Sequence, residues 1–163
     1  MQFKLWGSLL FILGSPICDM TLVAGIDTTI TKDNNNRWTV AYSTSQPVKR
    51  IAFVRNPDAS RVQRWTIANQ GLEIVLDDGK EYIVSKTKPL FQTATLSLTP
   101  SYKHLPKDYA PFSSFSDGST LIHSGRLFAC ENSCDDQLNE WKITLNAPKD
   151  DCIIVDGKTP DVE

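Results

Sequence analysis

Large apolar residues alternate with polar ones in several short runs of the chain. In the run RWTVAY, one face carries Trp38, Val40 and Tyr42, and the run EWKITLN at 140–146 repeats this pattern. A period of two with large apolar residues on one side is typical of a strand that buries one face. Further runs with strand character are Val48–Arg55, Arg64–Ala68, Leu72–Leu76, Glu81–Ser85, Leu90–Thr99, Thr120–His123 and Cys152–Asp156.

Turn residues separate these runs, and helical periodicity is hard to find. Asp77, Asp78 and Gly79 lie between two of the runs. Because Asp-Gly readily adopts the positive φ of a tight turn, Leu72–Ser85 is predicted to be a β-hairpin. Roughly eight or nine short strands in one domain predict an all-β fold, an antiparallel β-sandwich.

One long segment, Thr99–Ser119, interrupts the alternation with prolines and aromatic residues. Proline cannot donate to a strand ladder, so this segment is predicted to be a loop. A long ordered loop in a compact domain is usually functional or a contact surface. Its aromatic side chains must bury against their own domain or against a partner. We take them as the candidate binding surface: Tyr102, Tyr109, Phe112 and Phe115.

The first 25 residues have the order of features found in a secretory signal peptide. Lys4 is followed by an apolar run, Leu5–Leu13, which is too short to span a bilayer as a helix. The stretch Val23–Gly25 then has the small-residue character that signal peptidase needs. Cleavage after Gly25 leaves Ile26 at the new N-terminus. We therefore expect a periplasmic or extracellular protein, the alternative being that this stretch is a short apolar strand.

Size and charge narrow the class of protein further. Residues 26–158 are predicted to form one β-sandwich domain, and residues 159–163 a C-terminal tail or the start of a linker. The net charge of −2 and the pI of about 5.7 give no electrostatic footprint for nucleic acid. No Lys/Arg cluster or later apolar run indicates a membrane contact beyond the signal peptide. The sequence predicts no cofactor and leaves the oligomeric state open.

Cys130 and Cys134, in the stretch LFACENSC, can be a zinc half-site, a redox pair or a disulfide. Zinc needs two more ligands, and the available Cys152, His123 and His104 show no second ligand-pair spacing. A redox pair favours two intervening residues at a helix N-terminus, and neither feature is present. In an oxidising compartment the two cysteines are predicted to form a disulfide of modest effect on stability. Cys152 is then predicted to be a buried free thiol.

Hydrolytic motifs are absent from the sequence. His104 and His123 are its two histidines, and neither belongs to a His-Glu-x-x-His motif. Gly-x-Ser-x-Gly is absent as well. Ser124 follows His123 directly, but neighbouring residues on a strand point to opposite faces and cannot readily form a nucleophile–base pair. We predict no catalytic residue and no resident metal.

Two segments carry a resemblance to a known family. They are AFVRNPDASRVQRW and HLPKDYAPFSSFSDGSTLIHSGRLFAC. The chain from 37 to 158 resembles the N-terminal β-rich domain of exported gluzincin metallopeptidases of the glycyl-aminopeptidase type. The resemblance implies a domain that precedes a zinc-bearing catalytic domain, helps to shape its cleft and is not itself catalytic. The catalytic motif of that family is missing here, so the chain is expected to be a fragment or a truncated product.

Two functions follow as hypotheses. The first is a non-catalytic exported β-sandwich module that packs on a catalytic domain or binds a protein or peptide partner. The second is a small stand-alone protein that is hydrolytic or binds zinc through Cys130, Cys134, Cys152 and His123. A tightly held stoichiometric metal favours the second hypothesis, whereas an exposed apolar face favours the first.

Overall fold

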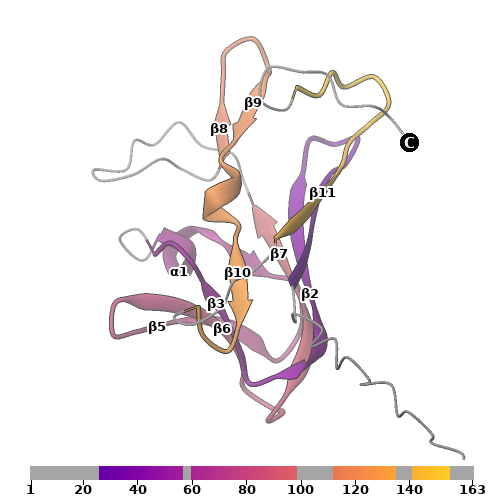
Figure 1. Cartoon of the computed structure of the whole chain (residues 1–163). Coiled ribbons are helices and arrows are strands. Elements are labelled where there is room, and N and C mark those ends of the chain that lie inside the picture. Colours follow the sequence, from indigo (N-terminus) through magenta and orange to yellow (C-terminus); the bar gives the residue numbers. More distant parts are fainter. Residues whose placement is uncertain (1–25, 57–59, 99–111, 135–140, 155–163) are drawn as a thin grey trace, which may run out of the picture.

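The computed structural model describes residues 26–56, 60–98, 112–134 and 141–154. Within these ranges the chain forms eleven strands, one α-helix of five residues and one short 3-10 helix. The all-β fold predicted from the alternation is therefore confirmed. The strands form two main layers, and a small hairpin projects from one end (Figure 1). No helix in the described ranges is long and apolar enough to cross a membrane.

One layer is a five-stranded sheet of order β11-β1-β2-β7-β4. Its neighbouring strands run antiparallel with one exception, since β11 lies parallel to β1. The sheets are antiparallel as predicted apart from this pair, which the sequence did not indicate. A parallel neighbour requires a long crossover, and the strands of the other layer supply it. The strands are β1 (Ile26–Lys32), β2 (Trp38–Val48), β4 (Thr66–Ile67), β7 (Phe91–Leu98) and β11 (Lys142–Asn146).

The other layer is an antiparallel sheet of order β10-β3-β6-β5. Its hairpin β5–β6 confirms the prediction made from Asp-Gly. Asp77 pairs with Lys80, and the two residues between them, Asp78 and Gly79, have φ of 47° and 72°. Two positive φ values are the signature of a type I′ turn. The strands are β3 (Arg50–Phe53), β5 (Leu72–Asp77), β6 (Lys80–Ser85) and β10 (Ala129–Glu131).

The core lies between the two layers. Trp38, Val40 and Tyr42 of β2 are at most 4% exposed, as their alternation predicts. The ring of Tyr42 meets that of Phe53 on the opposite sheet, with 5.9 Å between ring centroids. The Tyr42 hydroxyl donates a buried hydrogen bond of 2.9 Å to the carbonyl of Leu127. The two sheets thus share one core, as a sandwich requires.

The chain passes from one sheet to the other at a sharp corner. Strand β2 ends at Val48 and β3 begins at Arg50, so Lys49 is the one residue between them. The pairing of β2 with β7 shifts register between Ser43 and Val48, which is typical of a bulge that bends a strand. The sequence predicted one strand over Val48–Arg55. In the structure Val48 ends β2, and the next strand, β3, begins two residues later, at Arg50.

Several local predictions were incomplete or wrong. The projecting hairpin, β8 (Phe112–Ser114) paired with β9 (Thr120–Ile122), includes residues that were assigned to the long loop. Helix α1 (Ser60–Arg64) and the 3-10 helix η1 (Ser124–Arg126) had no clear signal. The strand predicted at Cys152–Asp156 is absent from its described residues, 152–154. Residues 1–25, 99–111 and 155–163 lie outside the described ranges, and with them the signal peptide and most of the loop.

Candidate functional site

The two cysteines of the stretch LFACENSC form the predicted disulfide. Cys130 belongs to β10 and is 1% exposed, and its Cα lies 5.3 Å from that of Cys134. The Sγ of Cys134 lies 3.7 Å from the carbonyl oxygen of Ala52 on β3. We call residues 130–134 the disulfide loop. Its first two residues belong to β10, and its last residue lies against β3.

Asn132, between the two cysteines, attaches the disulfide loop to the corner between β2 and β3. Its φ of 62° is in the left-handed region, which asparagine tolerates better than most residues. Its backbone N–H donates to the Arg50 carbonyl at 2.9 Å, and its own carbonyl accepts from Nε of Arg50 at 2.7 Å. Its side-chain oxygen accepts from the backbone N–H of Lys49 at 3.1 Å. Three hydrogen bonds therefore hold this residue on the corner.

Glu131 extends the attachment to the five-stranded sheet. It is 9% exposed, and its Oε1 accepts from the backbone N–H of Ser45 at 3.1 Å and lies 3.3 Å from the Ser45 hydroxyl. Ser45 belongs to β2, whereas Asn132 is bonded to the start of β3. The disulfide loop therefore spans the point where the chain changes sheets and ties both sides of it.

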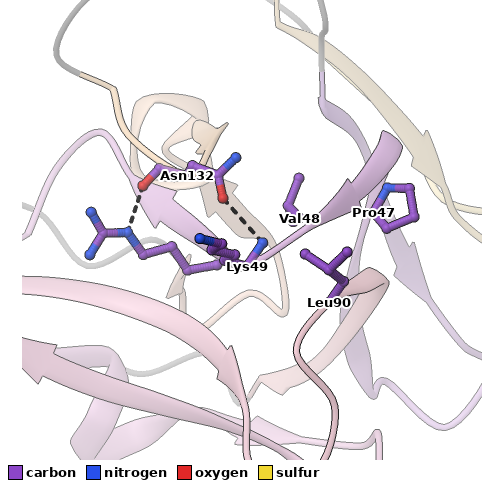
Figure 2. Close-up of a pocket in the computed structure, with 6 residues that line it drawn as sticks. Pro47, Val48, Lys49, Leu90 and Asn132 are labelled. Atoms are coloured by element: carbon purple, nitrogen blue, oxygen red, sulfur yellow. Dashed lines mark hydrogen bonds between the residues drawn. The ribbon is translucent and has the colours of Figure 1, made fainter.

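A cavity of about 550 Å³ opens beside this attachment (Figure 2). We call it the corner pocket. This volume falls within the range of about 300–1,000 Å³ that is common for ligand sites. The lining comes from the corner, from the residue that precedes β7 and from the disulfide loop: Pro47, Val48, Lys49, Arg50, Leu90 and Asn132.

The lining of the corner pocket has two cations and no carboxylate. The Lys49 side chain is exposed, and the Arg50 guanidinium stacks over the ring of Tyr82 at 4.3 Å. Within the described residues, neither cation forms an ion pair. Leu90 is 43% exposed and, with Pro47, supplies an apolar wall. The pocket is therefore suited to an anionic group attached to an apolar one.

The structure separates the aromatic residues that were expected to form one binding surface. Phe112 is 3% exposed, with its ring centroid 5.3 Å from that of Trp38, so it is a core residue and the prediction for it was wrong. Phe115 is 48% exposed, near Leu121 on the outer side of the β8–β9 hairpin. Tyr102 and Tyr109 lie outside the described residues.

The hypothesis of a zinc site requires Cys130 and Cys134 as ligands, but these two cysteines are joined in the disulfide. Cys152 is exposed, and it is not the buried thiol that was predicted, because its segment follows β11 on the surface without joining a sheet. His123 lies between β9 and η1, while His104 is outside the described residues. Across the described part of the chain, no group of three or more His, Cys, Asp or Glu residues is arranged to hold a metal ion.

A buried ion pair, Arg61–Glu81, has no counterpart in the sequence predictions. The two side chains are 1% and 0% exposed, and Nη1 of Arg61 donates to Oε2 of Glu81 at 2.7 Å. Oε1 of Glu81 accepts from the backbone N–H groups of Arg61 and Val62, at 2.7 and 3.0 Å. The pair thereby fixes helix α1 on the inner side of β6. Glu81 and Ile83 are two residues apart on β6 and therefore lie on the same face of the strand. The apolar Ile83 is thus the one local sequence feature that indicates a buried side chain at Glu81.

Both terminal nitrogens of the Arg61 guanidinium donate hydrogen bonds, whereas its buried Nε has no hydrogen-bond partner among the described residues. Its Nη2 donates to the Arg126 carbonyl at 2.6 Å, and the group lies 4.0 Å from the ring centroid of Phe53 and 5.1 Å from that of Trp65. Burial lowers the pKa of Arg61, and the charge of Glu81 opposes that shift. These contacts are structural, since they join α1, β3, β6 and η1 in the core.

Comparison of the chain with protein-family models, with curated proteins and with solved structures finds no match.

Proposed function

We propose that the chain is a non-catalytic, exported β-sandwich module that binds a protein or peptide partner at the corner pocket. The observation that carries the proposal is the composition of that pocket. Lys49 and Arg50 line the cavity together with the apolar Leu90, and no carboxylate lines it. A partner segment with a carboxylate next to an apolar side chain matches this chemistry, because both charge and apolar area are then complemented.

The disulfide cysteines and the buried carboxylates of the described chain have structural roles, and this supports a function in binding over one in catalysis. Cys130 and Cys134 are joined in the disulfide, and Glu81 is paired with Arg61 in the core. Glu131 is bonded to Ser45, which ties the disulfide loop to β2. Each of these groups has a structural task in the described chain. A rigid scaffold that displays an exposed, charged corner is typical of a binding module.

The resemblance to gluzincin peptidases remains a prediction. It makes a catalytic domain one class of partner for the module. Export remains a proposal as well. The Cys130–Cys134 disulfide, which closes the loop that contributes Asn132 to the pocket, is compatible with an oxidising compartment, where such bonds persist.

The proposal is tested by the affinity of the oxidised protein for a labelled hexapeptide, Ser-Leu-Glu-Leu-Glu-Ser, measured by fluorescence anisotropy. We expect Lys49→Glu to weaken binding by about tenfold or more, which corresponds to about 1.4 kcal/mol. Lys142→Glu, the same charge reversal on the edge strand β11, whose residues do not line the pocket, is the matched control and should leave the affinity within twofold. Equal affinity of the two variants, or equal binding of a peptide with Gln in place of Glu, contradicts the proposal.

A further inference from the structure

We propose that the outer edge of β5 is a second recognition site, which takes an extended peptide with alternating basic and apolar residues as an added strand. Strand β5 is the terminal strand of its sheet and pairs with β6 on one side. In Figure 1 it lies at the periphery of the sandwich, away from the β8–β9 hairpin. This inference rests on the proposed function as a binding module, but it uses a different surface from the corner pocket.

The type I′ turn fixes which backbone groups of β5 point outward. In a two-residue hairpin the residues that flank the turn, here Asp77 and Lys80, exchange both backbone hydrogen bonds. Bonded pairs then recur at every second residue. The bond from Lys86 N–H to the Gly71 carbonyl at 2.8 Å agrees with this phase. The N–H and C=O groups of Ile74 and Leu76 consequently point away from β6.

These outward groups have no partner in the described structure. Leu72, which also points outward, donates to the Asn69 carbonyl at 3.4 Å. The outward N–H and C=O groups of Ile74 and Leu76, in contrast, form no hydrogen bond with any described residue. An open edge of this kind is a template for one more strand. Strand β5 contains neither the proline nor the lysine with which many proteins protect such an edge.

Apolar side chains border the inner side of this edge. Leu76 is 51% exposed, and Val62 of helix α1 is 43% exposed. Glu81 is the cross-strand neighbour of Leu76 and accepts a hydrogen bond from the Val62 N–H, so the two apolar side chains lie near each other. An added strand with an apolar residue on this side would cover both of them.

The outer side of the edge is acidic. Glu73 and Asp77 lie on this face of β5, and Asp77 is directly opposite Lys80 of β6. At this pair a basic residue of β6 faces an acidic residue of β5. A peptide strand added beside β5 would continue the alternation of charge if its residues on this face were basic. Glu73 also contacts Lys86 at 3.0 Å, an exposed ion pair that contributes little and that a ligand can replace. Pairing with a second copy of β5 would instead bring acidic strands together, so we favour the basic peptide.

The probe is an acetylated and amidated heptapeptide, Thr-Lys-Ile-Lys-Val-Lys-Thr, at physiological ionic strength. Backbone hydrogen exchange is measured with and without it. In the free protein the amides of Ile74 and Leu76 should exchange much faster than those of Glu73 and Val75, which bond to β6. With saturating peptide, protection should appear at Ile74 and Leu76.

Two substitutions of Leu76 distinguish the loss of the outward backbone N–H from the loss of the leucine side chain. Leu76→Pro removes an outward N–H without removing a bond to β6, and we expect peptide affinity to fall about tenfold. Leu76→Thr keeps that N–H and should retain affinity within about threefold. A charge-reversed edge, Glu73→Lys with Asp77→Lys, should prefer the peptide in which Glu replaces Lys.

The outcomes distinguish the two sites. If the basic peptide fails to protect Ile74 and Leu76, or binds equally to Leu76→Pro, the inference is wrong, while binding of the acidic hexapeptide at Lys49 is unaffected. Protection that rises with protein concentration and without peptide points to a second copy of the chain, and also overturns it. If the acidic peptide fails and the basic peptide protects the edge, the corner pocket is refuted and the edge remains.

Discussion

The side-chain oxygen of Asn132 accepts the backbone N–H of Lys49 at 3.1 Å, so the disulfide loop holds the residue that carries the main charge of the corner pocket. These two residues are more than eighty positions apart in the sequence. Their contact joins Lys49, the one residue between β2 and β3, to a loop closed by a covalent bond. The charge of the pocket and the stability of its wall are therefore linked.

A change at Asn132 should alter recognition more than folding. Asn132→Asp keeps an oxygen for the Lys49 N–H and a residue type that tolerates a positive φ, but it adds a negative charge to the pocket wall. We expect about a tenfold loss of affinity for the acidic hexapeptide, with the denaturation midpoint nearly unchanged. Asn132→Gly keeps the backbone and omits the new charge, and it should bind more tightly than Asn132→Asp. The reverse order contradicts the charge argument.

Removal of the disulfide should affect both stability and binding. Cys130→Ser with Cys134→Ser opens a loop of four residues' separation, for which chain entropy gives a loss of about 2 kcal/mol in the free energy of unfolding. Because Asn132 lies inside that loop, affinity for the acidic peptide should fall as well. Urea denaturation and anisotropy measure the two effects. Cys152→Ser, which removes an exposed thiol, is the control and should change neither.

Phe112 and Phe115 should differ sharply in their effect on stability. Phe112 is in contact with Trp38 in the core, so Phe112→Ser should lower the free energy of unfolding by about 3–5 kcal/mol. Phe115 is about half exposed, and Phe115→Ser should cost less than about 1 kcal/mol. Chemical denaturation of both variants checks this. A small effect at Phe112 would return that residue to the candidate binding surface.

Loss of one partner of the buried ion pair should be more harmful than loss of both. Glu81→Leu leaves Arg61 charged and buried, and should destabilise the protein by about 3–5 kcal/mol. Arg61→Leu combined with Glu81→Leu removes both charges, and it should recover part of that loss. A double-mutant cycle in urea measures the coupling. Additive effects of the single and double substitutions would show that the two groups act independently.

Stability should decline at alkaline pH through Tyr42. Burial raises the pKa of this phenol far above its usual value of 10.0, and the nearby Arg61 opposes the shift only in part. Because the folded state favours the neutral phenol, this contribution is complete below pH 10 and is lost as pH rises above it. Tyr42→Phe should weaken the alkaline decline. At pH 7 it should cost about 1–2 kcal/mol, since the Leu127 carbonyl loses its donor.

Local chemistry was enough to predict part of the fold. The φ values of Asp78 and Gly79 follow from the Asp-Gly preference, and the buried face of β2 follows from its period of two. Both signals lie within a few neighbouring residues. The parallel pairing of β11 with β1 could not be predicted in this way, because it joins strands from opposite ends of the chain.

The sites depended on contacts between distant segments. Glu81 and Arg61 are twenty residues apart, and a charged residue in a short strand is usually taken for a solvent-facing one. The corner pocket combines residues near 48, 90 and 132, none of which belongs to a motif. The disulfide was predictable because its two cysteines are close in sequence, but its position over the corner was not.

The most direct test of the corner pocket is a ¹⁵N-labelled titration of the oxidised protein with the peptide Ser-Leu-Glu-Leu-Glu-Ser, followed by the backbone amide shifts. The account predicts saturable shifts at Lys49, Leu90 and Asn132, which disappear in Lys49→Glu and persist in Lys142→Glu. Shifts confined to Phe115 and Leu121 on the β8–β9 hairpin, or no saturable shift at any residue, would contradict it.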